Sequence, residues 1–266
     1  MVKTIAISSG KGGVGKTSLA VNSSIRLSME GMRVALLDAD FGMANSHILL
    51  DQKVQNTVQD ILENDISIDE VLHETSTGLK LIPGGSGILE LLNLDSKKRW
   101  EIIRSLDPLK ESLDYLVVDT PAGASDASID FAAACDKVVI VLVPEPTSFM
   151  DAYAFIKALN IEKNLDSVSV VVNLAANAAG AKKSFESFKK IVTKFLSIEV
   201  EYAGWLPKSS LIPSSIVARK PVILNKSLDQ TLKKSFSAIA KCFLEFEENR
   251  SSGIKFFNKL FDIMLH

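Results

Sequence analysis

The octapeptide Gly-Lys-Gly-Gly-Val-Gly-Lys-Thr, residues 10–17, constrains the fold more than any other part of the sequence. It fits the phosphate-binding pattern G-x-x-x-x-G-K-[ST], which is confirmed only when it lies between a β-strand and an α-helix. The flanking segments meet this requirement, because the β-rich run KTIAIS precedes the octapeptide and the helical pattern KTSLAVNSSIRLSMEG continues from Lys16. The octapeptide therefore predicts a P-loop in an α/β fold.

The rest of the chain alternates short apolar runs with helical patterns, as such a fold requires. Continuous apolar strands of this kind are typical of a parallel sheet that is covered on both faces. We predict a single doubly wound α/β domain of the P-loop NTPase type over residues 1–248, with a mostly parallel sheet of seven or eight strands. The expected strands cover residues 3–8, 33–38, 79–83, 115–120, 137–143, 167–173 and 200–206. Between them, the polar segment 52–76 is expected to add short helical turns at the rim of the sheet.

The P-loop predicts a set of nucleotide contacts. Its glycines let backbone N–H groups turn inward around a phosphate, and the helix that follows adds its dipole. Lys16 is expected to reach the β- and γ-phosphate oxygens, and the Thr17 hydroxyl to bind Mg²⁺. The expected cofactor-binding residues of this segment are Gly10, Lys11, Gly12, Gly13, Val14, Gly15, Lys16, Thr17 and Ser18.

Carboxylates follow two of the predicted strands. Asp38 and Asp40 come after the second strand and are two residues apart, so they point the same way while the chain stays extended. One can support Mg²⁺ and its waters while the other orients an attacking water. Asp119 ends another apolar strand and is placed to hold Mg²⁺ through water, and Gly123 lets a backbone N–H approach the γ-phosphate.

Composition and charge exclude several other classes. The 266 residues carry a formal net charge of -2, which gives no support to a protein that binds nucleic acid over its whole surface. The two cysteines, Cys135 and Cys242, lack the C-x-x-C spacing of zinc or iron–sulfur sites. No apolar stretch approaches the ~20 residues that span a bilayer.

Three blocks, GKGGVGKT, DADFGMAN and DTPAG, together resemble the MinD/ParA-type deviant Walker A ATPases. The resemblance implies a slow Mg²⁺-dependent ATPase with ATP and Mg²⁺ as cofactors, which dimerises on ATP. It also explains why the loop has two lysines. Lys16 holds the nucleotide in its own subunit, and Lys11 reaches the phosphates bound by the other subunit. Both lysines and Asp40 are then catalytic, with Asp40 positioning the hydrolytic water.

Other family positions are carried over in the same way. Asn45 and Glu145 match residues of the dimer interface, alongside Lys11. Asn173 matches an adenine contact, and Pro207 lies in the loop over the base. Asp119 matches the aspartate that contacts Mg²⁺ through water.

The segments DADFGMANSHILL and LIPGGSGI resemble the flagellar-number regulators of the FlhG group, also called FleN or YlxH. This implies control of flagellar number and placement at the cytoplasmic face of the inner membrane. The implied partners are the FlhF GTPase, flagellar switch or C-ring proteins, or a flagellar transcription regulator. The D-Q-A-x-x-L-R motif through which many members stimulate FlhF is missing, so the resemblance does not extend to it. The alternatives are a septum-site MinD, a ParA-type DNA partition ATPase, and a nucleotide-gated adaptor that scarcely hydrolyses ATP. DNA is not among the partners that we expect.

Residues 249–266, which include Ser-Ser-Gly at 251–253, are predicted to form a short linker and a C-terminal amphipathic helix of about 18 Å. That length suits a helix lying in a membrane interface. The alternative is a last helix that docks on its own domain. The expected membrane-contacting residues are Ile254, Phe256, Phe257, Leu260, Phe261 and Met264.

Overall fold

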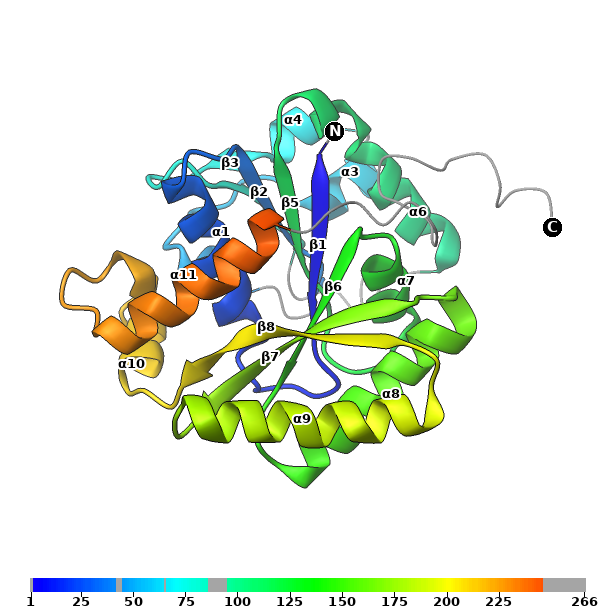
Figure 1. The fold of residues 1–266 in the computed structure, drawn as a ribbon. Helices are drawn as coiled ribbons and strands as arrows, with labels where there is room; N and C mark the ends of the chain where they lie inside the picture. Colours follow the sequence, from blue (N-terminus) through cyan, green and yellow to red (C-terminus); the bar gives the residue numbers. More distant parts are fainter. Residues whose placement is uncertain (1, 42–44, 65, 86–94, 246–266) are drawn as a thin grey trace.

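The computed structural model describes residues 2–41, 45–64, 66–85 and 95–245. One eight-stranded sheet runs through this part of the chain, in the order β3-β4-β2-β5-β1-β6-β7-β8 (Figure 1). All neighbouring pairs are parallel except β3 and β4. The strands are β1 (Lys3–Ser8), β2 (Val34–Asp38), β3 (His73–Glu74), β4 (Lys80–Ile82), β5 (Tyr115–Asp119), β6 (Lys137–Leu142), β7 (Ser167–Ala175) and β8 (Glu199–Pro207).

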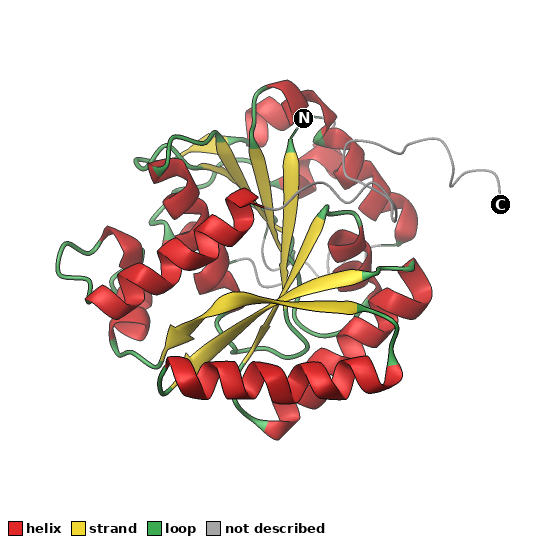
Figure 2. Ribbon diagram, viewed as in Figure 1, coloured by secondary structure: helices red, strands yellow, loops and turns green. Residues whose placement is uncertain are grey.

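Helices cover both faces of the sheet (Figures 1 and 2). One face packs against α1 (Lys16–Met29) and α11 (Gln230–Glu245), and the other against α7 (Asp126–Ala133), α8 (Pro146–Lys163) and α9 (Ala178–Phe195). The remaining helices are α2 (Ser46–Leu49), α3 (Val58–Asn64), α4 (Ile68–Val71), α6 (Ser96–Ser105), η1 (Asp107–Glu111), α10 (Leu211–Val217) and η2 (Val222–Leu224). The predicted doubly wound α/β fold is therefore confirmed.

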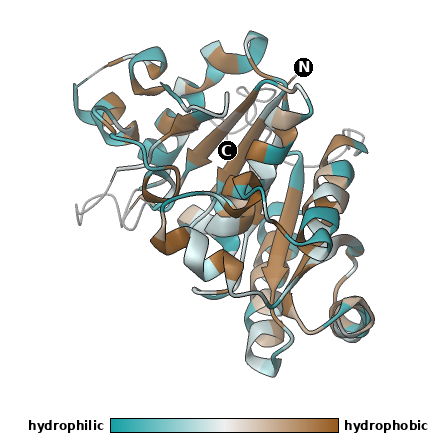
Figure 3. Cartoon of the chain, turned by 90° about the vertical axis from the view of Figure 1, so that its left-hand side faces the viewer, coloured by the Kyte–Doolittle hydropathy of each residue, from teal (hydrophilic) through white to brown (hydrophobic). Residues whose placement is uncertain are grey.

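The central strands are buried on both faces, which explains their continuous apolar sequences. Every residue of β2 and β5 is buried, and so are five of the six residues in β1 and in β6. Figure 3 shows the resulting brown strands between helices that are apolar on one side and polar on the other. Covering a parallel sheet with amphipathic helices in this way removes its apolar area from water.

The sheet differs from the prediction at one edge. Strand β3 has only two residues, and it pairs antiparallel with β4. It lies within the polar segment 52–76, where only helical turns were expected; two of these, α3 and α4, are present. A two-residue strand is too short to show alternation of apolar and polar residues, so no sequence period marks it.

No helix within the described ranges combines the length and apolar character that a membrane span requires. The predicted terminal helix, from Ile254 to Met264, lies outside the described residues.

Candidate functional site

The P-loop occupies the turn between β1 and α1, at the carboxyl edge of the sheet. Gly13 and Gly15 have φ values of 78° and 90°, which L side chains rarely adopt, and Gly15 is the residue directly before α1. Val14 between them is buried, so its side chain anchors the loop to the core. The loop can thus direct N–H groups toward a phosphate at the start of α1.

Gly10 is needed for a different reason, because the backbone of α8 lies against it. A Cβ atom at Gly10 would lie 2.2 Å from the carbonyl carbon of Asp151, whereas one at Gly12 meets nothing within 4 Å. We expect Gly10→Ala to lower the free energy of unfolding of the nucleotide-free protein by about 1–3 kcal/mol, because a backbone clash forces α8 to move. Gly12→Ala is the matched control and should change it by less than about 0.5 kcal/mol. Urea denaturation of both variants checks this, and equal stabilities would contradict it.

Lys16 and Asp119 form a buried ion pair at the base of the loop. Nζ of Lys16 lies 2.7 Å from Oδ1 of Asp119, and the two side chains are 6% and 0% exposed. The pair joins the start of α1 to the end of β5, which is the neighbour of β1 in the sheet. The second carboxylate oxygen of Asp119, Oδ2, is buried and has no hydrogen-bond partner among the described residues.

A buried carboxylate oxygen without a hydrogen-bond partner destabilises the fold unless a cation or a cation-bound water contacts it. Thr17, in the first turn of α1, follows Lys16 directly and offers a hydroxyl. The described residues contain no group of three His, Cys, Asp or Glu that could hold a metal by itself. This donor set fits Mg²⁺, which is usually held by one or two protein groups, waters and nucleotide phosphates.

Asp38 and Asp40 differ in burial and in hydrogen bonding. Asp38 is fully buried, and its Oδ2 accepts backbone N–H bonds from Asn45 at 3.0 Å and from Ser46 at 2.8 Å. Asp38 therefore ties the start of α2 to the end of β2. Asp40 lies just beyond β2 and is half-buried, with its carboxylate available to a ligand. Burial raises the pKa of Asp40, while the charge of Lys16 opposes that rise.

Asp38 also has an unusual pKa. Burial, followed by the negative charge of Asp119 on the neighbouring strand, raises the pKa of Asp38 from its usual 3.8 to about 7. The two residues are directly paired in the β2–β5 register, so their carboxylates lie close in a low-dielectric region.

This shift predicts a pH dependence of stability in the nucleotide-free protein. Between about pH 4 and pH 7 the folded state keeps a proton on Asp38 that the unfolded state has lost. The contribution of Asp38 to stability therefore falls as pH rises through this window, by at most about 1.4 kcal/mol per pH unit. We expect Asp38→Asn to remove this fall. Unfolding free energies of both proteins from pH 4.5 to 7.5 check it, and parallel curves would contradict it.

Lys11 is held by its own chain. Its Nζ lies 2.9 Å from Oε2 of Glu145 and donates to Oγ1 of Thr147 at 3.3 Å. Both partners belong to the start of α8, which packs behind the P-loop. Because Lys11 and Glu145 remain partly exposed, the pair contributes little to stability and can exchange partners.

Asn173, near the end of β7, lies beside the P-loop. Its Nδ2 donates to the carbonyl oxygen of Val14 at 2.7 Å, and its Oδ1 accepts the N–H of Leu174 at 2.8 Å. Asn173 thus braces the loop, and its amide keeps one N–H for a further partner. Pro207, the last residue of β8, pairs with Ala175 of β7, so Asn173 and Pro207 both lie at the carboxyl ends of neighbouring strands.

The remaining predicted residues also lie around the loop. The N–H of Gly123 donates to the carbonyl oxygen of Ser9 at 2.9 Å, which brings the turn after β5 against the P-loop. Asn45 is exposed at the start of α2. Sequence reasoning missed two contributors, Thr147 beside Lys11 and the backbone N–H of Ser46 on Asp38. No local signal marks either, because each contact depends on the tertiary fold.

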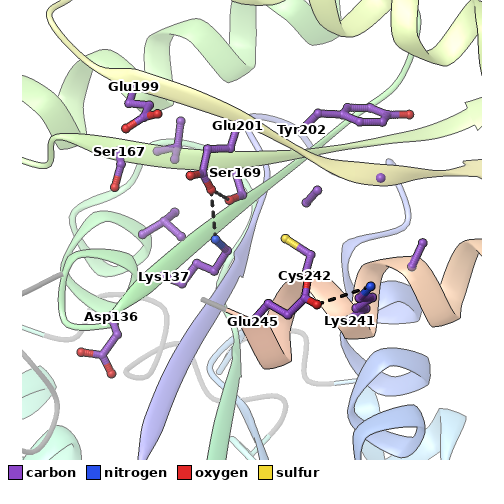
Figure 4. Close-up of a pocket in the computed structure, with 15 residues that line it drawn as sticks. Asp136, Lys137, Ser167, Ser169, Glu199, Glu201, Tyr202, Lys241, Cys242 and Glu245 are labelled. Carbon is purple, nitrogen blue, oxygen red and sulfur yellow. Dashed lines mark hydrogen bonds and ion pairs between the residues drawn. The ribbon is translucent and has the colours of Figure 1, made fainter. Parts of the chain in front are cut away.

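A cavity of about 700 Å³ lies elsewhere, at the amino ends of β6, β7 and β8 beside the last turns of α11 (Figure 4). Its charged side chains are largely engaged with one another. Glu201 accepts from Lys137 at 3.2 Å and from Ser169 at 3.1 Å, and Lys241 pairs with Glu245 at 3.4 Å. None of the predicted site residues lines this cavity. It lies at the amino ends of the strands, whereas the P-loop lies at their carboxyl ends.

Comparison with known proteins agrees with this geometry. The profile of a family described as "AAA domain" matches residues 2–170, and that of "NUBPL iron-transfer P-loop NTPase" matches residues 101–244. The antiactivator FleN of Pseudomonas aeruginosa is 34% identical over 83% of this chain and 79% of its own. The flagellum site-determining protein YlxH of Helicobacter pylori is 33% identical over 97% of this chain and 88% of its own. Among solved structures, the MinC:MinD cell division protein complex of Aquifex aeolicus contains a chain with a TM-score of 0.76, at 24% identity, covering 92% of this chain and 97% of that one.

Proposed function

The chain belongs to the MinD/ParA family of P-loop ATPases, and we propose that it is an ATP-switched regulator of flagellar number or placement. The observation that carries this proposal is the similarity, over most of the chain, to the flagellum site-determining protein YlxH and to the antiactivator FleN. The arrangement around the P-loop supports the nucleotide-dependent part.

ATP hydrolysis would use the residues gathered at the carboxyl edge of the sheet. The loop amides and Lys16 bind the phosphates, and Asn173 and Pro207 contact the base. Bound Mg²⁺, held by Thr17 and through water by Asp119, would neutralise phosphate charge. Asp40 orients the attacking water. The lysine that completes the site, Lys11, comes from the second subunit, so hydrolysis depends on dimerisation.

Asp40 gives a direct test of this assignment. We expect Asp40→Ala to lower ATP turnover by about 10²-fold or more while ATP-dependent dimerisation persists, because only the positioning of the water is lost. Steady-state phosphate release and size-exclusion chromatography measure the two effects. Asp40→Asn, which keeps the shape but not the charge, should behave similarly. Unchanged turnover in both variants would remove Asp40 from the mechanism.

For attachment to the membrane, we propose the C-terminal helix from Ile254 to Met264. A single short helix binds a bilayer weakly, but two on one dimer bind far more tightly through effective concentration. Co-sedimentation with anionic liposomes in ATP and in ADP, beside a chain ending at Arg250, tests this. Pelleting that requires both ATP and the tail supports the proposal. If the full chain stays in solution in ATP, the helix does not act as an anchor.

The biological role is tested by deleting the gene in the source organism and counting flagella per cell. A changed number or position of flagella with normal division supports the flagellar role. Minicells with normal flagella would instead favour a division role like that of MinD, which the A. aeolicus structure makes the first alternative. Salt-sensitive binding to DNA would favour a partition ATPase.

A further inference from the structure

Asp40 lies two residues beyond the end of β2, yet the chain around it is fixed on both sides. The N–H of Ala39 donates to the carbonyl oxygen of Asp119 at 2.9 Å, which extends the contact between β2 and β5 by one residue. The N–H of Asp40 donates to Oδ1 of Asp38 at 3.3 Å. Ala39 and Phe41 are buried, whereas Asp40 between them is half-buried. The backbone of Asp40 is therefore held in place while its carboxylate stays available to a ligand.

The ring of Phe41 anchors this segment in the core. Phe41 is 3% exposed, and its ring makes an edge-on contact with Phe131 of α7, with the two centroids 5.4 Å apart and the ring planes at 63°. This arrangement is favourable for two aromatic rings. Helix α7 follows the turn that contains Gly123, so the contact also joins the Asp40 segment to the turn that lies against the P-loop. Loss of the Phe41 ring would leave a cavity directly after Asp40 in the chain.

A second anchor comes from the loop after β4. Gly84 is buried, and a Cβ atom at this position would lie 2.2 Å from the carbonyl oxygen of Asp38 and 2.8 Å from Cδ1 of Phe41. The loop is itself held, because the N–H of Val58 in α3 donates to the carbonyl oxygen of Pro83 at 2.9 Å. Glycine at position 84 therefore lets this loop pack directly against the backbone of Asp38 and the ring of Phe41.

We propose that Phe41 and Gly84 are positioning residues for ATP hydrolysis, which hold the Asp40 carboxylate where it can orient the attacking water. The proposal rests on the proposed function, in which Asp40 has that role. A side chain that orients a reacting water must be held within a fraction of an ångström, and packing around its neighbours supplies that precision. Neither Phe41 nor Gly84 has a polar side chain that could bind a phosphate. Their loss should therefore affect the rate of hydrolysis and not the affinity for ATP.

Phe41→Ala removes the first anchor. We expect it to lower the ATP turnover number by about tenfold or more, because a displacement of a catalytic group by about 1 Å can lower the rate by about 10²-fold. The dissociation constant for ATP with Mg²⁺ should change by less than about threefold. Phe41→Leu keeps a large apolar side chain in the core and should retain most of the turnover. Steady-state phosphate release and isothermal titration calorimetry measure the two quantities.

The nucleotide-free protein gives a second readout. In Phe41→Ala the backbone N–H groups of Ala39 and Asp40 should exchange with deuterium at least about tenfold faster, because local opening of the segment becomes easier. Phe243→Ala is the matched control, since Phe243 of α11 is also fully buried but packs on the opposite face of the sheet. It should lower the stability of the protein while leaving unchanged both the turnover number and the exchange at Ala39 and Asp40.

Gly84→Ala tests the second anchor and keeps the proposal testable if Phe41→Ala fails to fold. The added methyl group would collide with the carbonyl oxygen of Asp38. We therefore expect a loss of turnover similar to that of Phe41→Ala, again with little change in ATP affinity. Gly180→Ala is its control, because it adds the same group at the start of α9, where the nearest contact is at 3.4 Å. This control should leave turnover unchanged.

The double variant D40A/F41A separates this proposal from the proposed function. If Phe41 acts through Asp40, the double variant hydrolyses ATP at the same rate as Asp40→Ala, because the effects of residues that act together are not additive. A further loss in the double variant, as large as the loss in Phe41→Ala alone, would overturn the proposal. Normal turnover in Phe41→Ala or Gly84→Ala would also overturn it. Normal turnover in Asp40→Ala would instead remove the catalytic role of Asp40, on which the proposal depends.

Discussion

We expect Lys16→Ala to lower the affinity for ATP by at least about 10²-fold, which is loss of detectable binding in most assays. Lys16 is the P-loop cation buried beside Asp119, and it lies at the start of α1, where we propose that the phosphates bind. Removing a buried, hydrogen-bonded charge partner costs roughly 2–5 kcal/mol of binding free energy. Isothermal titration calorimetry with ATP and Mg²⁺ measures the effect, and an affinity within tenfold of the original would contradict it.

A second variant is needed because Lys16→Ala also affects folding. The substitution leaves the carboxylate of Asp119 buried and unpaired, which costs about 3–5 kcal/mol of stability. We therefore expect the double variant K16A/D119N to recover much of that stability but none of the ATP binding. If the double variant also regained binding, the loss in Lys16→Ala would reflect misfolding and not the missing cation.

Most of the sheet could be predicted because its strands are buried on both faces. Residues 3–8 and 115–119 are short runs rich in β-forming apolar residues, and they form β1 and β5 within one residue of the expected bounds. The edge strand β3 could not be predicted, since its two residues, His73 and Glu74, are held by pairing with β4 and have no pattern of their own.

The candidate site shows the same division between local and tertiary information. The P-loop, Asp38 and Asp119 are placed by local sequence, because the P-loop follows a buried strand and the two aspartates end buried strands. The bond from Asn173 to Val14 joins residues 159 positions apart, and the Lys11–Glu145 pair joins residues 134 positions apart. Such contacts are fixed by the order of the strands, which the sequence pattern does not reveal.

Lys11 carries the second large prediction. We expect Lys11→Ala to bind ATP within a few-fold of the unmodified chain but to remain monomeric in ATP, because it removes the cation that, in the proposed ATP dimer, reaches the other subunit's phosphates. Within the described parts of the chain, the Lys11 side chain pairs with exposed groups at the start of α8, so its removal should leave stability within about 1 kcal/mol. Analytical ultracentrifugation with and without ATP measures the change in mass.

The matched control is Glu145→Gln, which breaks the same 2.9 Å ion pair but keeps the lysine. If dimerisation requires the cation, Glu145→Gln still dimerises in ATP while Lys11→Ala does not. If both variants stay monomeric, the ion pair itself shapes the interface, and Lys11 acts by positioning the start of α8. A Lys11→Ala protein that dimerises normally would show that the second lysine of the loop has no part in assembly, and the ATP switch would have to depend on another group.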